Sequence, residues 1–453
     1  MAAGRNSVVP FDAVVLGSGP GGRGAAGGLA HAGLSVAMVE AELVGGECPF
    51  WACIPSKALL RPVEARGEAA HVAGLRAPEA SWPEIAEYRD YMNSGLDDTT
   101  KAKSLANRGI EIVRGYGRIT GPGRVTVDGR ELSAHRIVVA TGTTSAVPPI
   151  KGLDGIDYWT NREATALQEI PRSAIVLGGG PVGVELGQML SRYGAQVTIV
   201  QGAERLLARE HESVGDQLAH LLRGEGIDVR LGIHADAAEA AGGEVRMHLE
   251  SGQWLSAERL LVAVGRKPRV EGIGLGEVGV APGTQGIAVD QHCRAADGVW
   301  AVGDVTGVSP FTHVAAYQAA IACADILGAP RPADYRAIPR VVFCDPEVAT
   351  VGLTPDGARE RGIRSQIASV DLSEVDRTET YGRDLKGHLG VLADADRRVV
   401  VGAWAVGPLA SEWIHGLVIA IKAEVPIDVL RDTIVQFPTF SEAIITAVRR
   451  LDL

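Results

Sequence analysis

Cysteine is scarce in this chain, which has five among its 453 residues: Cys48, Cys53, Cys293, Cys323 and Cys344. A small and odd set does not form the disulfide framework of a secreted protein, so a redox pair here is expected to perform chemistry. No stretch offers the roughly 18 uninterrupted apolar residues of a membrane span, and Met1–Phe11 lacks the apolar run of a secretory leader. These absences exclude a disulfide-rich mini-protein and predict a protein of the reducing cytoplasm.

Basic residues are also fewer than acidic ones. The chain has 44 lysine and arginine residues and 55 aspartate and glutamate residues, which gives a formal net charge of −11. Non-specific binding to nucleic acid or to an anionic membrane needs a cationic surface, so we expect neither partner. Hydrophobic residues make up 46% of the chain and charged residues 22%, as in ordinary globular proteins. At about 150 residues per domain, the length indicates about three domains.

Glycine, in contrast, is abundant, with 57 residues gathered in clusters. Two clusters repeat one plan: an apolar strand, a G-x-G-x-x-G turn, a helix rich in small residues and a second β-rich run. The copies begin at Ala13 and Ala174, and their glycine turns are Gly17–Gly22 and Gly178–Gly183. Such a βαβ unit predicts a dinucleotide site, because the glycines let the backbone approach a pyrophosphate at a helix N-terminus. The expected contact residues are Gly17, Gly19, Pro20, Gly22, Gly178, Gly180, Pro181, Val182 and Gly183.

The two copies differ where the second strand ends. Glu40 ends the strand of the first copy and is suited to accept hydrogen bonds from a ribose 2′-hydroxyl. The second copy has Gln201 there, which can bind a ribose without repelling a 2′-phosphate, and Arg205 could approach such a phosphate. NAD and NADP are therefore both open. Two nucleotide sites indicate a flavin-plus-nicotinamide oxidoreductase, with FAD in the first copy because the cysteine pair follows it.

The cysteine pair lies in the segment Gly45-Gly46-Glu47-Cys48-Pro49-Phe50-Trp51-Ala52-Cys53-Ile54-Pro55-Ser56-Lys57. Its C-x4-C spacing and the following I-P-S-K resemble the redox signature of the class I pyridine nucleotide-disulfide oxidoreductases, the family of dihydrolipoamide, glutathione and mercuric reductases. The resemblance extends along the chain through Ala140-Thr141-Gly142, Glu185, Gly265-Arg266-x-Pro268, Gly303-Asp304 and Cys344-Asp345-Pro346-Glu347.

The resemblance implies an α/β fold with two Rossmann-like domains, which bind FAD and NAD(P), and a C-terminal α+β dimerisation domain. The implied boundaries are residues 1–150 for the first part of the FAD-binding domain, 151–275 for the NAD(P)-binding domain, 276–335 for the second part of the FAD-binding domain and 336–453 for the dimerisation domain. A homodimer is expected, together with a small-molecule electron acceptor or donor.

The resemblance also implies residue roles. NAD(P)H passes a hydride to FAD, the flavin reduces the Cys48–Cys53 disulfide, and the dithiol passes electrons onward by thiol-disulfide exchange. Cys48 is then the interchange thiol and Cys53 the charge-transfer thiolate beside the flavin. Lys57 resembles the family lysine near the flavin, with Glu185 as its ion-pair partner, although a plain surface salt bridge is the alternative.

Further positions match FAD contacts of the family. Asp304 corresponds to the aspartate that binds the ribityl chain, and Phe311, Thr312 and His313 lead a helix whose positive end would face the flavin. Other backbone matches to cofactor contacts are Gly117, Thr141, Gly142 and Gly265. The remaining three cysteines are expected to be packing residues, and no metal site is expected.

Two departures from the family pattern stand out. The relatives carry H-P-T-x-x-E near the C-terminus, with the histidine as the acid/base for the interchange thiol, whereas this chain has Phe437 in that place and keeps Glu442. A phenyl ring carries no proton. In addition, Glu47 precedes Cys48, where it is expected to raise the pKa of the thiol. Phe50 and Trp51 either shape an acceptor pocket or pack in the core.

The departures keep several functions open. An NAD(P)H-dependent enzyme acting through the cysteines on a small disulfide or dithiol is the leading interpretation. A reductase of a quinone or other small non-thiol acceptor is the second, and a low-turnover flavin redox sensor or complex subunit is the third. Mercuric reductases collect metal with a C-terminal cysteine pair, and the segment Arg449–Leu453 has none, so we do not expect metal reduction by that route.

Overall fold

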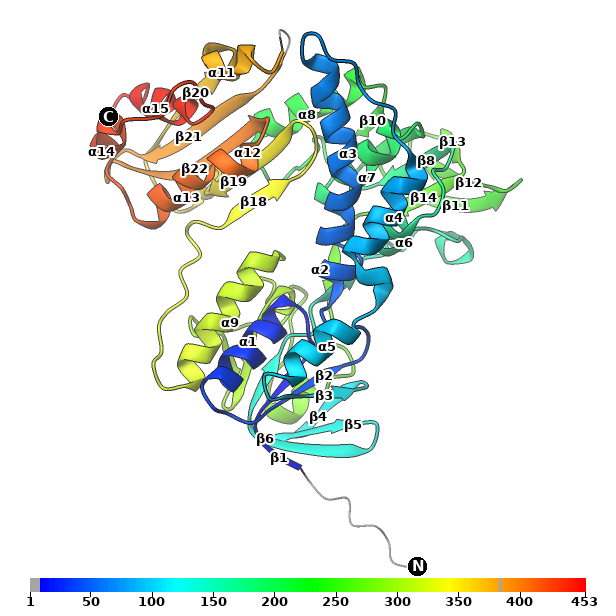
Figure 1. Ribbon diagram of the computed structural model, residues 1–453, viewed down its shortest axis with the longest axis vertical. Helices are drawn as coiled ribbons and strands as arrows, with labels where there is room; N and C mark the ends of the chain where they lie inside the picture. Colours follow the sequence, from blue (N-terminus) through cyan, green and yellow to red (C-terminus); the bar gives the residue numbers. More distant parts are fainter. Residues whose placement is uncertain (1–8, 383–384) are drawn as a thin grey trace, which may run out of the picture. The chain divides into compact units, whose positions relative to one another are not determined.

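The computed structural model describes residues 9–382 and 385–453, and its chain divides into two compact units (Figure 1). Residues 1–8, on which the expected absence of a leader partly depends, lie outside the described residues. The first unit consists of residues up to Pro55, Tyr88–Ala146 and Arg266–Asp334. The second consists of Ser56–Glu87, Val147–Gly265 and Tyr335–Leu453. The four domain ranges expected from the sequence stay predictions.

An eight-stranded sheet is the centre of the first unit. Its main path runs β16-β17-β6-β1-β2-β3, and β4 and β5 extend it as antiparallel hairpins. β1 pairs in parallel with both β2 and β6, as a dinucleotide-binding sheet requires. The strands are β1 (Val9–Leu16), β2 (Val36–Glu40), β3 (Ile110–Arg114), β4 (Gly117–Gly121), β5 (Arg124–Val127), β6 (Arg130–Val139), β16 (Arg294–Ala296) and β17 (Val299–Ala301). A separate pair joins β7 (Thr143–Ser145) to β15 (Arg266–Pro268).

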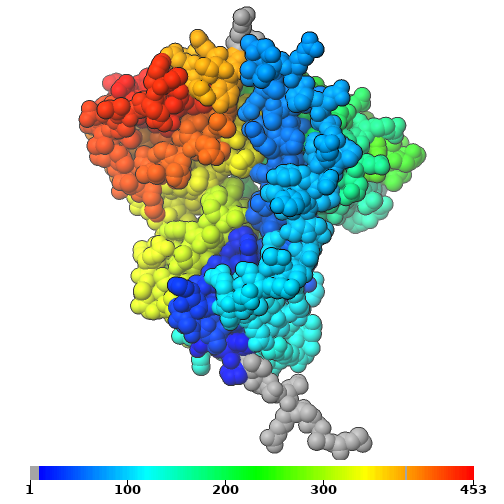
Figure 2. Space-filling view, viewed as in Figure 1, coloured from blue at the N-terminus to red at the C-terminus, as the bar shows by residue number. Residues whose placement is uncertain are grey.

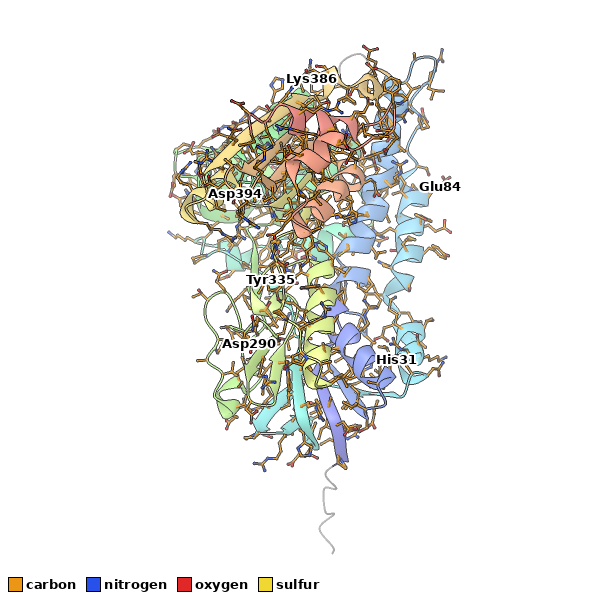
Figure 3. All side chains as sticks on the ribbon, turned by 90° about the vertical axis from the view of Figure 1, so that its left-hand side faces the viewer. His31, Glu84, Asp290, Tyr335, Lys386 and Asp394 are labelled. Carbon is orange, nitrogen blue, oxygen red and sulfur yellow. The ribbon has the colours of Figure 1, made fainter. Side chains whose placement is uncertain are left out.

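Helices α1 (Pro20–His31) and α9 (Thr312–Ile326) lie side by side in the first unit (Figure 1). A Cβ atom added at Gly24 of α1 would come within 2.9 Å of the Ala319 side chain, so small residues permit this close packing. Apolar residues of both helices share one core cluster with β1 and β2. Figure 3 labels His31, the last residue of α1. This pairing fixes where the N-termini of both helices lie.

The second copy of the βαβ unit has the topology predicted from the sequence. Its sheet is parallel in the order β10-β9-β8-β14, with β8 (Ser173–Leu177), β9 (Gln196–Gln201), β10 (Asp228–Leu231) and β14 (Arg259–Val262). The helices are α6 (Asn161–Ala166), α7 (Pro181–Arg192) and α8 (Glu212–Gly224). A small antiparallel sheet contains β11 (Ala235–Ala241), β12 (Glu244–Leu249) and β13 (Trp254–Ala257).

The C-terminal segment is an antiparallel five-stranded sheet with short helices, and its last helices contribute to the orange and red surface of Figure 2. The strands are β18 (Pro339–Val342), β19 (Glu347–Gly352), β20 (Ser365–Asp371), β21 (His388–Asp394) and β22 (Val399–Gly407). The helices are α10 (Pro355–Glu360), α11 (Asp376–Glu379), α12 (Ala410–Trp413), α13 (His415–Lys422), α14 (Ile427–Asp432) and α15 (Glu442–Arg449). Asp394, labelled in Figure 3, ends β21.

Four further helices follow the first copy of the βαβ unit. They are α2 (Glu47–Phe50), α3 (Cys53–His71), α4 (Trp82–Met92) and α5 (Thr99–Ala106). Pro83 lies in the first turn of α4, where proline fits because that turn needs no backbone N–H donor. No helix among the described residues is long and apolar enough to cross a membrane.

Two partly buried histidines meet in the second unit, at the start of α8 and the start of β21. The Ser213 hydroxyl lies 2.9 Å from Nδ1 of His211 and 2.8 Å from Nε2 of His388, and Gln217 hydrogen-bonds the other nitrogen of His388. The His211 ring stacks on Trp404 with 3.8 Å between the ring centroids. Burial lowers the pKa of His388 to about 4, and the neighbouring His211 contributes in the same direction.

We predict that His388 makes the protein less stable in acid. Its pKa in the folded chain lies below the value of about 6.5 in the unfolded chain, so unfolding takes up a proton between those values and stability falls as the pH falls. Between pH 7.5 and pH 5 this group alone is expected to cost about 2 kcal/mol. The thermal unfolding midpoint of wild type should therefore drop more over this range than that of His388→Gln. His220→Gln, an exposed change on α8, is the control, and equal drops in all three proteins contradict the prediction.

Candidate flavin, nicotinamide and dithiol site

The two glycine turns have nearly identical backbone contacts. A Cβ atom at Gly22 would lie 2.0 Å from the carbonyl oxygen of Gly17, and one at Gly183 would lie 1.9 Å from that of Gly178. Gly17 and Gly178 have φ of +98° and +114°, and a Cβ atom at either would collide with the strand beside it. Only glycine fits these positions, so both turns hold the helix start tightly against the strand.

The N-termini of α1 and α7 are free of side-chain caps. Added Cβ atoms at the N-cap residues Gly19 and Gly180 would have no heavy atom within 4 Å, and Pro20 and Pro181 occupy the first helical positions, with Val182 next to Pro181. Unpaired backbone N–H groups at open helix starts favour anions. Both starts therefore fit a dinucleotide pyrophosphate.

The ends of β2 and β9 make the same contact with different side chains. Glu40 accepts hydrogen bonds from the backbone N and hydroxyl of Ser18, at 2.9 and 2.5 Å. Gln201 accepts from the backbone N of Gly179 at 3.0 Å and donates to the carbonyl of Arg205 at 3.2 Å. The carboxylate of Glu40 keeps acceptor capacity for a ribose. The side chain of Arg205 lies 3.7 Å from Glu212.

The other expected FAD positions gather in the first unit. Asp304 is largely buried and accepts a hydrogen bond from the Thr143 hydroxyl at 3.0 Å. Burial raises the pKa of Asp304, and Arg266 opposes that rise. The Thr141 hydroxyl donates to the carbonyl of Arg269 at 2.7 Å. Gly142 has φ of +70°, and Gly117 lies so close to Leu16 that a Cβ atom would approach it to 2.7 Å.

The cysteine pair lies at the N-terminus of α9. Thr312, the first residue of that helix, donates its hydroxyl to the sulfur of Cys48 at 3.3 Å and lies 3.5 Å from the sulfur of Cys53. Cys53 is itself the first residue of α3, so the partial positive charge of a helix start is near its sulfur. Phe311 precedes Thr312 and stacks on His313 with 5.2 Å between the ring centroids. Sequence reasoning assigned Thr312 to the flavin and missed its contact with the sulfurs.

The environment of Cys48 differs from the one expected from its neighbour Glu47. The hydrogen bond with Cys53 and burial raise the pKa of the Cys48 thiol well above its usual value, and the Thr312 hydroxyl and the charge of Arg23 offset only part of that rise. The Glu47 carboxylate turns to Arg266, with which it forms an ion pair, and to Arg269 at 3.4 Å. Its charge is therefore neutralised by arginines rather than directed at the thiol.

Phe50 and Trp51, the aromatic pair after Cys48, differ in burial, which bears on whether each packs in the core or shapes an acceptor pocket. Phe50 is buried, and the ammonium group of Lys101 lies 4.6 Å from its ring centre. Phe50 is thus a packing residue. Trp51 is half-buried, with its ring centroid 5.7 Å from that of Phe50. The other cysteines, Cys293, Cys323 and Cys344, are buried, in agreement with a packing role.

Lys57 and Glu185, both in the second unit, form the predicted ion pair with 2.7 Å between Nζ and Oε2. Glu185 is buried and also accepts the backbone N–H of Phe343 at 2.8 Å, and the Lys57 ammonium lies 4.6 Å from the Phe343 ring centre. A pair anchored by a main-chain donor inside the unit is not a plain surface salt bridge. Its role beside the flavin stays a prediction.

Phe437, which takes the place of the family histidine, is exposed and presents 70% of its surface to solvent. Glu442, the first residue of α15, accepts the backbone N–H of Thr439 at 2.9 Å and so stabilises the start of that helix. Gly265, the remaining predicted cofactor contact, has φ of +137° and open space around its Cβ position.

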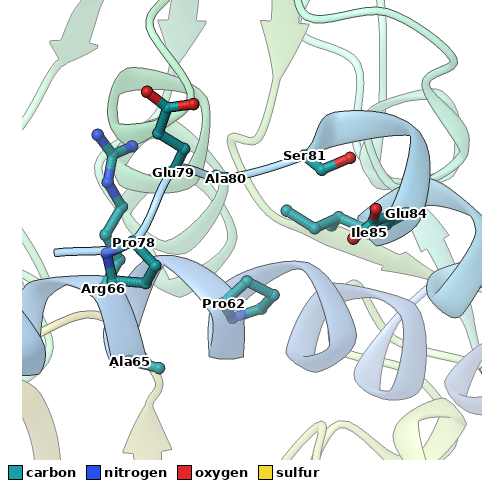
Figure 4. Close-up of a pocket in the computed structure, with 9 residues that line it drawn as sticks. All are labelled: Pro62, Ala65, Arg66, Pro78, Glu79, Ala80, Ser81, Glu84 and Ile85. Carbon is teal, nitrogen blue, oxygen red and sulfur yellow. The ribbon is translucent and has the colours of Figure 1, made fainter.

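A surface pocket of about 300 Å³ also lies in the second unit (Figure 4). Pro62 and Arg66 of α3, the loop residue Glu79, and Glu84 of α4 contribute to its lining. None of the site residues predicted from the sequence lines this pocket, so it is separate from the chemistry described above.

Two glycine turns with open helix starts, a partly buried aspartate and a neighbouring pair of cysteines define a flavin- and nicotinamide-dependent oxidoreductase. Comparison with known proteins agrees. Residues 11–320 match the pyridine nucleotide-disulphide oxidoreductases, and residues 338–448 match the dimerisation domain of the same family. The chain belongs to this family. Its members use FAD and NAD(P)H, and the dimerisation domain supports a homodimer.

Individual relatives span the whole chain. It is 35% identical to a dihydrolipoyl dehydrogenase of Thermus scotoductus, with 97% of both chains covered. It is 30% identical to a mercuric reductase of Bacillus cereus, covering 98% of this chain and 72% of that relative. The flavoprotein disulfide reductase RclA of Escherichia coli, described as HOCl-induced, has a similar structure, with a TM-score of 0.87, 28% identity and coverage of 97% and 100%.

We predict that alanine at two glycines of the first turn separates folding from FAD binding. Gly22→Ala places a Cβ atom 2.0 Å from a carbonyl oxygen and should give little folded, FAD-containing protein. Gly19→Ala meets no protein atom and has an ordinary φ of −59°, so the protein should fold but bind FAD roughly tenfold more weakly, about 1.4 kcal/mol. Circular dichroism and FAD titration of apoprotein test both variants. Full FAD affinity in Gly19→Ala would contradict FAD binding at the start of α1.

Proposed function

We propose that this enzyme oxidises NAD(P)H and passes the electrons through a Cys48–Cys53 disulfide to a small disulfide substrate. The observation that carries the proposal is the shared Thr312 hydroxyl, which lies within 3.3 and 3.5 Å of the two sulfurs. A hydroxyl within reach of both sulfurs can stabilise whichever thiolate forms. When bound, FAD accepts a hydride from NAD(P)H and delivers an electron pair to the disulfide.

The chain's own residues then carry out the exchange. The Cys48 thiolate attacks one sulfur of the substrate disulfide, forms a mixed disulfide and releases the first substrate thiolate. Cys53 attacks the sulfur of Cys48, which re-forms the protein disulfide and releases the second thiolate. The substrate gains the two electrons that the dithiol loses, and both released thiolates take protons from water. Cys53 suits the second step because the start of α3 stabilises its thiolate.

Residue roles outside the dithiol are also part of the proposal. Gly17, Gly19, Glu40 and Asp304 would hold FAD, and the turn beginning at Gly178 would hold the nicotinamide cofactor, with Gln201 toward the ribose. In a homodimer, the exposed Phe437 would approach the dithiol of the partner subunit, in the place where the resemblance implies a histidine. Glu442 would then be a structural residue that starts α15.

We predict that anaerobic titration with NADH or NADPH produces a long-wavelength absorption band from a thiolate beside the flavin. Cys53→Ser should abolish the band because its thiolate is the donor, whereas Cys48→Ser should keep the band and lose disulfide reduction. Spectra and stopped-flow mixing with small disulfides and with quinones provide the measurement. No band in a fully FAD-loaded wild type would refute the role of Cys53.

A second function is favoured by the exposed phenyl ring of Phe437, which supplies no proton for thiol exchange. In this second function, the flavin would pass electrons directly to a quinone or another small non-thiol acceptor, and the cysteines would not be required. The same Cys48→Ser variant separates the two functions, since full acceptor reduction without Cys48 would rule out the dithiol route.

We further predict that Phe437→His raises turnover of lipoamide or glutathione disulfide by about tenfold or more, because a positioned histidine adds general acid-base catalysis. Phe437→Gln, which changes the ring without adding a titratable group, is the control. Steady-state rates at pH 7 are the measurement. An unchanged rate in Phe437→His would mean that substrate binding, rather than proton supply, limits these reactions.

A further inference from the structure

The end of β9 presents a neutral amide where the end of β2 presents a carboxylate. In the first copy, Glu40 accepts a hydrogen bond from the backbone N of Ser18. In the second copy, Gln201 accepts one from the backbone N of Gly179 at 3.0 Å. The two side chains make the same contact with their glycine turns, but only the carboxylate is charged. A carboxylate at this position repels the 2′-phosphate that distinguishes NADPH from NADH, whereas an amide does not.

Arg205 lies directly beside this amide. The side chain of Gln201 donates to the carbonyl of Arg205 at 3.2 Å, so the backbone that carries the guanidinium is held at the end of β9. The ion pair of the guanidinium is long, with 3.7 Å between Nη1 and Oε2 of Glu212, and the two side chains are 40% and 68% exposed. An exposed pair contributes little free energy. The guanidinium is therefore available to another anion at little cost.

His234 approaches the same strand end from the turn after β10. A Cβ atom added at Gly202, the residue after Gln201, would lie 2.4 Å from Cε1 and 2.7 Å from Nδ1 of the His234 ring. The backbone N of Ile233 donates to the carbonyl of Gln201 at 3.2 Å, which fixes this turn against the end of β9. The imidazole therefore lies against the backbone that follows Gln201, where it can donate an N–H to a ligand.

Glu204 is the carboxylate next to Arg205 in the sequence, but its side chain is directed further along the turn. A Cβ atom at Gly232 would lie 2.8 and 3.0 Å from the two carboxylate oxygens of Glu204. The backbone N of Gly232 donates to the carbonyl of Ala203 at 3.0 Å, so the two turns run along each other. The imidazole meets these turns at the residue after Gln201, whereas the Glu204 carboxylate meets them beyond it. An arginine and a histidine thus flank the end of β9.

We propose that Arg205 and His234 bind the 2′-phosphate of NADPH and make this enzyme prefer NADPH to NADH. The proposal rests on the proposed function, in which a nicotinamide nucleotide reduces the enzyme. The guanidinium offers a phosphate two parallel N–H donors, and the imidazole offers a third from the opposite turn. Gln201 keeps its contact with the glycine turn and adds no charge. A hydrogen bond to a charged group is worth about tenfold in affinity.

Fragments of the two nucleotides test the proposal without turnover. FAD-loaded enzyme is titrated by calorimetry with adenosine 2′,5′-bisphosphate, which carries the 2′-phosphate, and with 5′-AMP, which does not. Wild type should bind the bisphosphate about tenfold more tightly than 5′-AMP. Arg205→Met and His234→Gln should each weaken bisphosphate binding by about tenfold and leave 5′-AMP binding unchanged, and Arg205→Lys should keep part of the preference. Arg172→Met, an exposed change at the opposite end of the sheet just before β8, is the control.

A reverse variant and the steady-state rates complete the test. Gln201→Glu, which gives the second copy the carboxylate of the first, should weaken bisphosphate binding and lower kcat/KM for NADPH relative to NADH. Equal affinities of wild type for the two fragments would overturn the proposal, and an unchanged preference in Arg205→Met or His234→Gln would overturn the role of that residue. Failure of the proposed function has a different signature, because full acceptor reduction in Cys48→Ser leaves the fragment affinities unaffected.

Discussion

Contact between backbone atoms at the turn after β1 is the constraint on which the rest of the first unit depends. The carbonyl of Gly17 occupies the space that a side chain at Gly22 would need, so α1 begins directly against the strand that precedes it. The open N-terminus of α1 results from this approach, and so does the surface on which Gly46 rests. The same contact between Gly178 and Gly183 shapes the second glycine turn, so the same backbone arrangement occurs twice in the chain.

The site arises because three helix starts meet around one dithiol. Gly46 rests on the start of α1, Thr312 opens α9 beside the two sulfurs, and Cys53 opens α3. Each helix start has unpaired N–H groups and a partial positive charge. A cluster of such starts favours anions, which suits both a pyrophosphate and a thiolate. The small residues where α1 meets α9 permit this arrangement, because a Cβ atom at Gly24 would lie 2.9 Å from the Ala319 side chain.

Charge near the dithiol is arranged differently from what the residue order indicates. Glu47 adjoins Cys48 along the chain, but Arg266 and Arg269 neutralise its carboxylate. Phe437 stands at the position of the family histidine, and the Thr312 hydroxyl lies beside the Cys48 sulfur.

The sequence by itself determined the two βαβ units, the glycine turns and the C-x4-C spacing of Cys48 and Cys53. These features follow from backbone conformations and short spacings, which leave a local pattern of residue types. The Lys57–Glu185 ion pair, whose members are 128 positions apart, was predicted from the family resemblance instead. Tertiary structure alone decided the partners of Glu47 and the contact of Thr312 with the sulfurs. Thr312 reaches Cys48 across 264 positions and Arg266 reaches Glu47 across 219. Such contacts have no local pattern, because they form only when the sheet and the packing of α1 on α9 bring distant segments together.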